Sequence, residues 1–217
     1  MASCTNLAKG TAIGAGGGAV LGAIIGNIAG NTAVGAAIGG AVGAGAGAII
    51  GKKMDKAKAA AAQVANAQVE SVTDANGYQA VKVTFDSGIL FTTGSSTLSA
   101  SAMSSLNKFA NDVLKQNTDM NVGIVGYTDN QGWKNSTAEQ SALKNQALSL
   151  QRAQAVTNYL TKQGVSTSQI KETAGLGEQN PVADNSTAAG QKQNRRVEVF
   201  LYASDEMIKQ AEAGTLQ

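Results

Sequence analysis

The sequence predicts an α+β fold, an α/β sandwich with two main helices on a mixed sheet, preceded by a glycine-rich helical hairpin. Between residues 77 and 203, segments with alternating apolar residues are interspersed with two amphipathic helical segments. More than half of the 26 glycines fall between Gly10 and Gly51, a stretch without any charged residue. One domain and one accessory segment therefore account for the 217 residues.

The first nine residues contain the only cysteine, Cys4. The small residues before it, in Ala2-Ser3-Cys4, resemble the end of a bacterial lipobox, where the cysteine is acylated after signal-peptide cleavage. We expect residues 1–9 to be a lipidated N-terminus whose signal peptide is missing, with a replacement Met1. The alternative is an unmodified thiol in a flexible terminus.

Residues 10–51 repeat glycine at every fourth position in two runs. Each run has about 20 residues, or about 30 Å of helix, which matches the hydrocarbon thickness of a bilayer. In water each glycine costs a helix about 1 kcal/mol relative to alanine. We therefore expect a glycine-zipper transmembrane hairpin, with soluble or interfacial homo-oligomerisation and a disordered linker as alternatives.

An Ala-rich stretch over residues 52–76 contains Lys, Gln and Glu, and is expected to be a solvated helical linker. Two membrane spans would return the chain to its starting side. Lys9, Lys52 and Lys53 would then flank the face that carries an acylated Cys4.

The C-terminal domain is expected over residues 77–203. Period-2 patterns predict strands, and helical spacing predicts helices, the longer of which ends at Gly164 as a C-cap. The expected strands are 78–85, 122–127, 170–174 and 196–202; the expected helices are 99–114 and 138–163. A short tail helix is expected over 204–217.

Composition excludes several chemistries. The chain has no histidine, so neither a thiol–imidazole metal cluster nor a nucleophile with a histidine base can be built, and we expect no metal, no cofactor and no enzymatic activity. The formal charge of +2 gives no clustered basic footprint for nucleic acid. If the chain were a wall hydrolase, Asp129 and Glu178 would be its plausible carboxylate pair.

An ordered series of short motifs points to a known family. The series comprises Phe85-Asp86-Ser87-Gly88-Ile89-Leu90-Phe91, Gly126-Tyr127-Thr128-Asp129, Asn145, Leu148-Ser149, Arg152-Ala153, Tyr159-Leu160, Gly164-Val165, Gly175-Leu176-Gly177-Glu178, Pro181, Asn185-Ser186-Thr187, Gly190 and Asn194-Arg195-Arg196-Val197-Glu198. Over residues 78–203 the chain resembles the OmpA-type peptidoglycan-binding domain, with the first of these motifs as its entry strand. It departs from the family at Tyr127, which stands where His is usual, at Gln191, where Arg is frequent, and in a longer loop over 132–145.

The resemblance implies a ligand, the diaminopimelate of the peptidoglycan stem peptide, whose side chain ends in an ammonium and a carboxylate on one carbon. It assigns the contacts to Asp129 and Arg152, with Asn145 and Arg196 as supporting groups. The chemistry fits, because a carboxylate can take the ammonium while a guanidinium donates two N–H bonds to the carboxylate. On their predicted helix, Asn145 and Arg152 share one face with Ser149.

Two further side chains have open interpretations. Trp133 in the long loop is expected to be an exposed or partly packed aromatic, with stacking on a sugar ring as the alternative. Arg195 is expected to be a surface residue.

The expected function is non-covalent peptidoglycan binding by a lipid-anchored outer-membrane protein whose C-terminal domain lies in the periplasm. Its partners would be peptidoglycan and, through Cys4 and residues 10–51, membrane lipid. The alternative is a membrane oligomer or pore formed by the glycine zipper, with the domain only positioning it on the wall.

Overall fold

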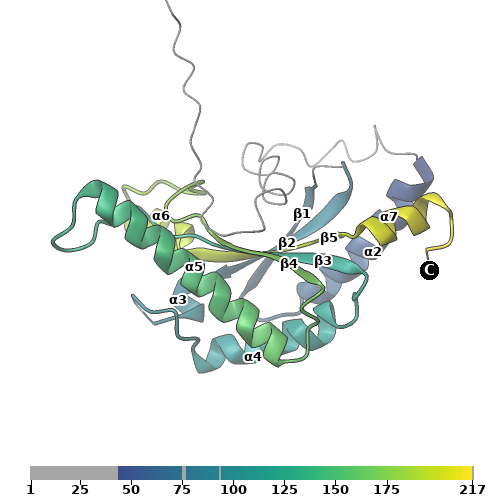
Figure 1. The fold of residues 1–217 in the computed structure, drawn as a ribbon, viewed down its shortest axis with the longest axis horizontal. Helices are drawn as coiled ribbons and strands as arrows, with labels where there is room; N and C mark the ends of the chain where they lie inside the picture. Colours follow the sequence, from purple (N-terminus) through teal and green to yellow (C-terminus); the bar gives the residue numbers. More distant parts are fainter. Residues whose placement is uncertain (1–43, 75–76, 93, 217) are drawn as a thin grey trace, which may run out of the picture.

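The computed structural model describes residues 44–74, 77–92 and 94–216. Its elements follow in the order α2 Ala44–Ala61, β1 Ala67–Thr73, β2 Gln79–Asp86, α3 Ser87–Leu90, α4 Ala100–Phe109, the π-helical turn η1 Ala110–Leu114, β3 Met120–Gly126, α5 Ala138–Lys162, β4 Ile170–Gly175, α6 Ala188–Asn194, β5 Arg196–Ala203 and α7 Asp205–Glu212. The strands form one five-stranded sheet in the order β1-β2-β5-β3-β4. Only the β3–β4 pair is parallel within it. The predicted α+β class is confirmed (Figure 1).

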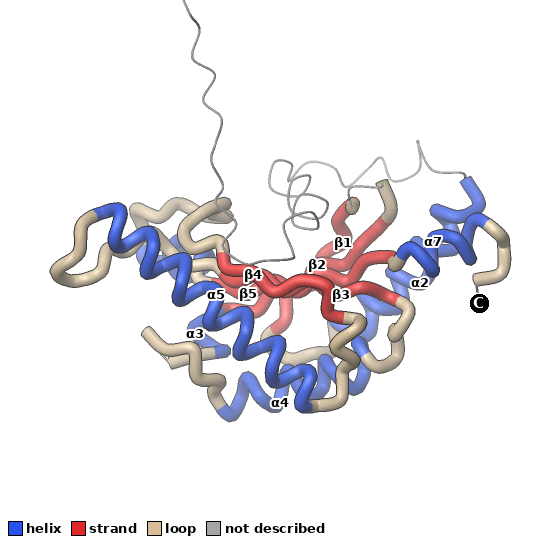
Figure 2. Tube along the Cα trace, in the orientation of Figure 1, coloured by secondary structure: helices blue, strands red, loops and turns tan. Residues whose placement is uncertain are grey.

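Helices α4 and α5 lie side by side on one face of the sheet (Figures 1 and 2). Each begins at a hydroxyl cap: Ser99 Oγ accepts the backbone N–H of Ala102 at 3.0 Å, and Thr137 forms a capping box with Gln140. Beneath them, the ring of Phe85 from β2 meets the ring of a helix phenylalanine edge-on, with centroids 5.7 Å apart. The helix expected over 99–114 is divided, because its last turn, η1, is π-helical.

Two glycines bring α5 directly onto the ends of β3 and β4. A Cβ atom at Gly126 would overlap the carbonyl oxygen of Ser149, and one at Gly175 would overlap the backbone nitrogen of Leu150. Any side chain at either position would push the helix away from the sheet. The glycines therefore fix the height of α5 above the loop that follows β3.

The segment before the domain differs from the expected 52–76 linker. Helix α2 runs across the boundary between the glycine-rich segment and the linker and ends at Ala61, and Ala67–Thr73 is the edge strand β1. The buried residues of α2 follow at intervals of three or four and join the main core: Ala46, Ile50, Met54, Ala57 and Ala61. Its lysines lie on the remaining faces, which explains why the composition looks solvated.

Helix α7 also contributes to the core, through Met207 and Ala211, and packs against α2 at one end of the domain (Figure 1). The domain thus extends on both sides of the expected 77–203 range. Because residues 46 and 50 are buried in this core, the C-terminal end of the expected 10–51 membrane hairpin is corrected. Its remaining residues, 10–43, lie outside the described part of the chain, and no described helix is long and apolar enough to cross a membrane.

The segment 85–91, expected to be an entry strand, leaves the sheet at Asp86. The carboxylate Oδ1 of Asp86 accepts the backbone N–H of Gly88 at 2.6 Å and caps the short helix α3. This turn and the loop after it form one wall of a cavity.

Candidate functional site

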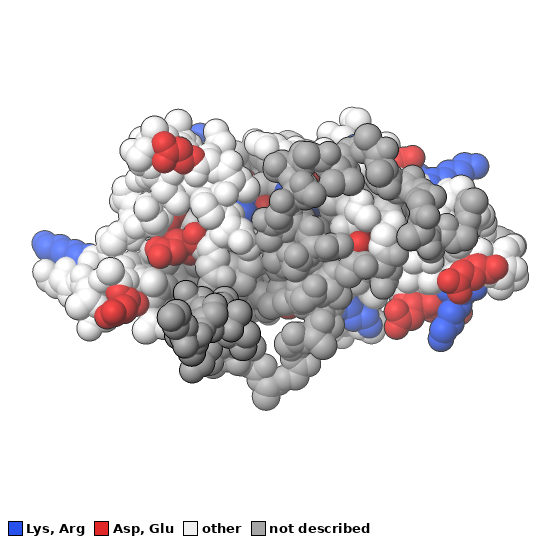
Figure 3. Space-filling model, turned by 90° about the horizontal axis from the view of Figure 1, so that it is seen from above, with Lys and Arg blue, Asp and Glu red and all other residues white. Residues whose placement is uncertain are grey.

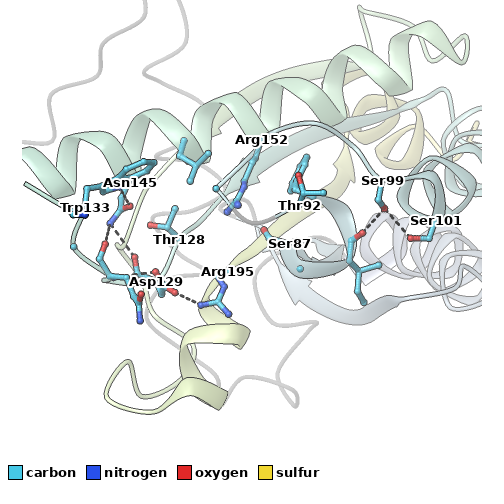
Figure 4. A pocket seen from close by; sticks show the side chains of 18 residues that line it. Ser87, Thr92, Ser99, Ser101, Thr128, Asp129, Trp133, Asn145, Arg152 and Arg195 are labelled. Atoms are coloured by element: carbon cyan, nitrogen blue, oxygen red, sulfur yellow. Dashed lines mark hydrogen bonds and ion pairs between the residues drawn. The ribbon is translucent and has the colours of Figure 1, made fainter.

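A cavity of about 950 Å³ opens between the α3 turn, the loop after β3 and the facing side of α5 (Figure 4). Its size is within the range of small-molecule sites. Three groups of residues line it: the α3 turn and the start of α4, the loop after β3 with the facing side of α5, and the end of α6. They are Ser87, Gly88, Ile89, Phe91, Thr92, Gly94, Ser99, Ser101, Thr128, Asp129, Gln131, Gly132, Trp133, Lys134, Asn145, Leu148, Arg152 and Arg195.

The structure brings Asp129 and Arg152 to this same cavity. Asp129 lies in the loop after β3, where the backbone N–H of Thr128 donates to Gly177 O at 2.8 Å and holds the loop beside the end of β4. Its Oδ1 accepts the N–H of Gln131 at 3.2 Å, and its Oδ2 is ion-paired with Nη1 of Arg195. Only 6% of Asp129 is exposed. The carboxylate is therefore both held in place and turned toward the cavity.

One hydrogen bond and one cation–π contact hold the Arg152 side chain. Its Nε donates to Ser95 O at 3.1 Å, and its guanidinium carbon lies 5.3 Å from the ring centroid of Phe91, within cation–π range. Neither Nη has a protein acceptor within the described ranges. Burial lowers the pKa of Arg152, the positive charge of Arg195 lowers it further, and Asp129 opposes both. Even so, an arginine stays protonated, so Arg152 presents a cation with two free donor groups.

Asn145 lies in the cavity wall, but its side chain is occupied by the loop after β3. Its Oδ1 accepts Nε1–H of Trp133 at 2.8 Å, and its Nδ2 donates to Gln131 O at 3.1 Å. One turn before it, Ser141 Oγ accepts the backbone N–H of Trp133 at 3.0 Å. These bonds tie the long loop to α5.

Arg196, the fourth candidate, does not line the cavity. Its side chain lies on the opposite face of the sheet, where Nε donates to Glu198 Oε1 at 2.7 Å and the guanidinium carbon lies 3.8 Å from the ring centroid of Tyr127. Its Nη atoms donate to the carbonyls of Asn194 and Asn180. Burial raises the pKa of Tyr127, with the charge of Glu198 adding to the effect, so this phenol stays neutral.

Arg195 and Trp133 also line the cavity. Trp133 is a partly packed loop aromatic, 38% exposed, as expected. Arg195 was expected at the surface; it is the C-cap of α6 and reaches Asp129. Because successive side chains near a strand alternate between faces, only one of Arg195 and Arg196 can face the Asp129 loop. That rule alone does not say which one.

Glu178 and Cys4 are the remaining sequence candidates. Glu178 does not line the cavity, so the structure does not set it across a cleft from Asp129. Cys4 lies outside the described residues. On the face seen in Figure 3, acidic and basic side chains are intermixed toward the end that carries α2 and α7.

Residues 90–195 match the model of the OmpA family, and residues 13–58 match the model named Glycine zipper. Over residues 90–195 the chain is therefore OmpA-like. Asp129, Asn145, Arg152 and Arg195 all lie within the matched range of this OmpA-like domain.

Two curated relatives share this part of the chain. "Probable lipoprotein YiaD" of Escherichia coli is 43% identical over 121 residues, which is 55% of this chain and 47% of the relative. "Peptidoglycan-binding protein ArfA" of Mycobacterium tuberculosis is 45% identical over 96 residues, 44% of this chain and 26% of the relative. The chain thus spans less than half the length of either.

Among solved structures, a putative MotB-like protein from Desulfovibrio vulgaris superposes with a TM-score of 0.56 at 22% identity. The match covers 72% of this chain and 94% of that one. At this identity it supports the fold of the OmpA-like domain alone.

Proposed function

We propose that the OmpA-like domain binds peptidoglycan non-covalently, by gripping the zwitterionic end of diaminopimelate in the stem peptide. The observation that carries this proposal is the convergence of one carboxylate, Asp129, and one guanidinium with free Nη groups, Arg152, on a single cavity. Asp129 takes the ammonium and Arg152 takes the carboxylate in a two-bond fork. The curated name of ArfA, a relative that shares this region, supports the ligand class.

In this proposal Asn145 and Arg196 act on the protein, not on the ligand. Asn145 holds the loop that carries Asp129, because both ends of its amide are bonded to that loop. Arg196 fixes Tyr127 and Asn194 from the opposite face of the sheet. Loss of either would change the position of Asp129 or Arg195, so both are positioning residues.

The experiment compares two tripeptides that differ at one group. L-alanyl-γ-D-glutamyl-meso-diaminopimelate carries the side-chain zwitterion, whereas the same tripeptide with L-lysine carries only the ammonium. The proposal predicts that the first displaces the protein from insoluble peptidoglycan and that the second displaces it poorly. Equal displacement by both would show that the site does not read the side-chain carboxylate.

We further propose that the chain links this wall contact to the outer membrane, with an acylated Cys4 as its lipid anchor and the domain in the periplasm. The curated name of YiaD, a probable lipoprotein, supports the lipid anchor. Mass spectrometry of the mature N-terminus, after expression behind an intact lipoprotein signal peptide, tests it. An acylated cysteine is the expected result, and an unmodified one would contradict the anchor.

A further inference from the structure

The cationic and anionic groups of the proposed site, Arg152 and Asp129, differ in their protein partners. On the cationic half, Arg152 keeps both Nη groups without a protein acceptor in the part of the chain that is described, and only its Nε is bonded, to Ser95. On the anionic half, Asp129 is already paired with a cation of the protein, Arg195. Figure 4 shows the two arginines approaching from different elements, Arg152 from α5 and Arg195 from the end of α6.

Arg195 is placed so that it can leave Asp129. Its side chain is 36% exposed, against 9% for Asp129, so it reaches the carboxylate from the solvent side. Its backbone is fixed independently: its carbonyl accepts the N–H of Ser87 at 3.0 Å, and its N–H donates to Gln191 O at 3.1 Å. The guanidinium can therefore move while the end of α6 stays in place.

We infer that Arg195 occupies the ammonium position at Asp129 and competes with the ligand's ammonium for that carboxylate, so that it sets how strongly the site prefers ligands that carry the amino group. This inference rests on the proposed function. A side-chain ammonium entering the site gains the attraction of Asp129 only after Arg195 has withdrawn or begun to share it. The ligand's carboxylate meets no such competitor at Arg152.

The charges around the cavity point the same way. Its lining contains one acidic residue, Asp129, and three basic ones: Lys134, Arg152 and Arg195. The charge of Arg195 is close enough to Arg152 to lower the pKa of Arg152. Arg152 and Arg195 together attract a carboxylate and repel an ammonium. Arg195 therefore weakens the preference for the zwitterion in two ways, by competing for Asp129 and by repelling the ligand's ammonium.

The test uses a ligand pair that isolates the ammonium. The diaminopimelate tripeptide is compared with the same tripeptide containing 2-aminopimelate, which keeps the side-chain carboxylate and lacks the side-chain amino group. The measured quantity is the Kd of the second divided by the Kd of the first, obtained by calorimetry with the full chain. Arg195→Gln should raise this ratio about threefold or more, the scale of a partly exposed ion pair.

Three further variants separate competition at Asp129 from a general change in charge. Lys134→Gln also removes one cation from the cavity wall but no ion pair with Asp129, and it should leave the ratio within about twofold of wild type. Arg195→Lys keeps the charge and should give a ratio nearer to wild type. Adding Arg195→Gln to Asp129→Asn should change the ratio much less than in the wild type, because the shared carboxylate is gone and only the repulsion by Arg195 remains.

The outcomes are distinguishable. An unchanged or lower ratio in a folded Arg195→Gln variant overturns the inference while leaving the proposed function standing, provided that the wild type binds the diaminopimelate tripeptide. A rise of equal size in the Asp129→Asn background also overturns it. If the wild type binds neither tripeptide, the proposed function itself fails and takes this inference with it.

Discussion

The substitution Arg152→Ala removes the group on which the proposed carboxylate contact depends. Arg152 is only 4% exposed, so a ligand carboxylate that loses it is left desolvated beside Phe91 without the guanidinium that would bind it. Truncating one partner of such a buried charge pair costs about 2–4 kcal/mol of binding free energy. The Kd for the diaminopimelate tripeptide should therefore rise roughly 30-fold or more.

The same substitution has a separate effect on folding. It removes the bond from Nε to Ser95 O and the cation–π contact with Phe91. Together these are worth about 1–2 kcal/mol of unfolding free energy, which a domain of this size can lose and remain folded. Arg152→Lys should recover little of the binding, because an ammonium cannot form the planar two-bond fork.

The assay is calorimetric titration with the tripeptide, together with a urea unfolding curve for each variant. Lys162→Ala is the matched control, since it removes a cation from the exposed end of the same helix, away from the cavity. It should leave the Kd unchanged. If Arg152→Ala is folded and its Kd stays within a factor of two of wild type, Arg152 does not bind the ligand carboxylate.

Three further predictions concern the fold around the site. Met54→Ala should lower the unfolding free energy by about 2–3 kcal/mol, because Met54 is fully buried in the core; a loss below about 0.5 kcal/mol would mean that α2 is not part of the domain. Gly126→Ala should cost about 2–3 kcal/mol by forcing α5 off β3, whereas Gly45→Ala, which has open space around it, should be neutral or slightly stabilising; similar effects of the two changes would contradict the close packing. Burial raises the pKa of Glu172 from 4.5 to about 7. The unfolded chain therefore releases this proton first, and stability falls as the pH rises from about 4.5 to about 7. Urea unfolding curves at pH 5 and pH 8 measure this loss of unfolding free energy. Glu172→Gln should reduce the loss by about 1 kcal/mol, a value discounted because Glu172 is half-exposed. If the variant has the same pH dependence as wild type, Glu172 is not the group responsible.

The elements around the site follow from local signals in the sequence. The long amphipathic segment ending at Gly164 indicates α5, and the structure shows its C-cap at Gln163 and Gly164 with φ +91°. A strand followed by Thr128-Asp129 indicates a loop beside that helix. These signals place Asp129 in a loop and Arg152 on a helix face that could lie opposite it. The structure brings both residues to one cavity.

The structure differs from the sequence prediction at several positions for one physical reason, which is that burial depends on tertiary packing. In α2 the buried positions are mostly alanines, spaced among lysines and glycines, so the apolar stripe is weak until the sheet that covers it is known. The exchange of roles between Arg195 and Arg196 depends on which of them begins β5, a boundary that sequence patterns place only within a few residues. The amide of Asn145 looks like a ligand group in the sequence, and only the loop contacts show that it is already bonded.

Sedimentation with insoluble peptidoglycan tests whether Asp129 and Arg152 hold the domain on the wall. Residues 44–217 are suitable, because α2, β1 and α7 all belong to the folded unit. We expect this fragment to sediment with diaminopimelate-type peptidoglycan and lysine-type peptidoglycan to retain little of it. The folded double variant Asp129→Ala, Arg152→Ala should stay in the supernatant. Sedimentation of the folded double variant to the same extent as wild type would contradict this expectation.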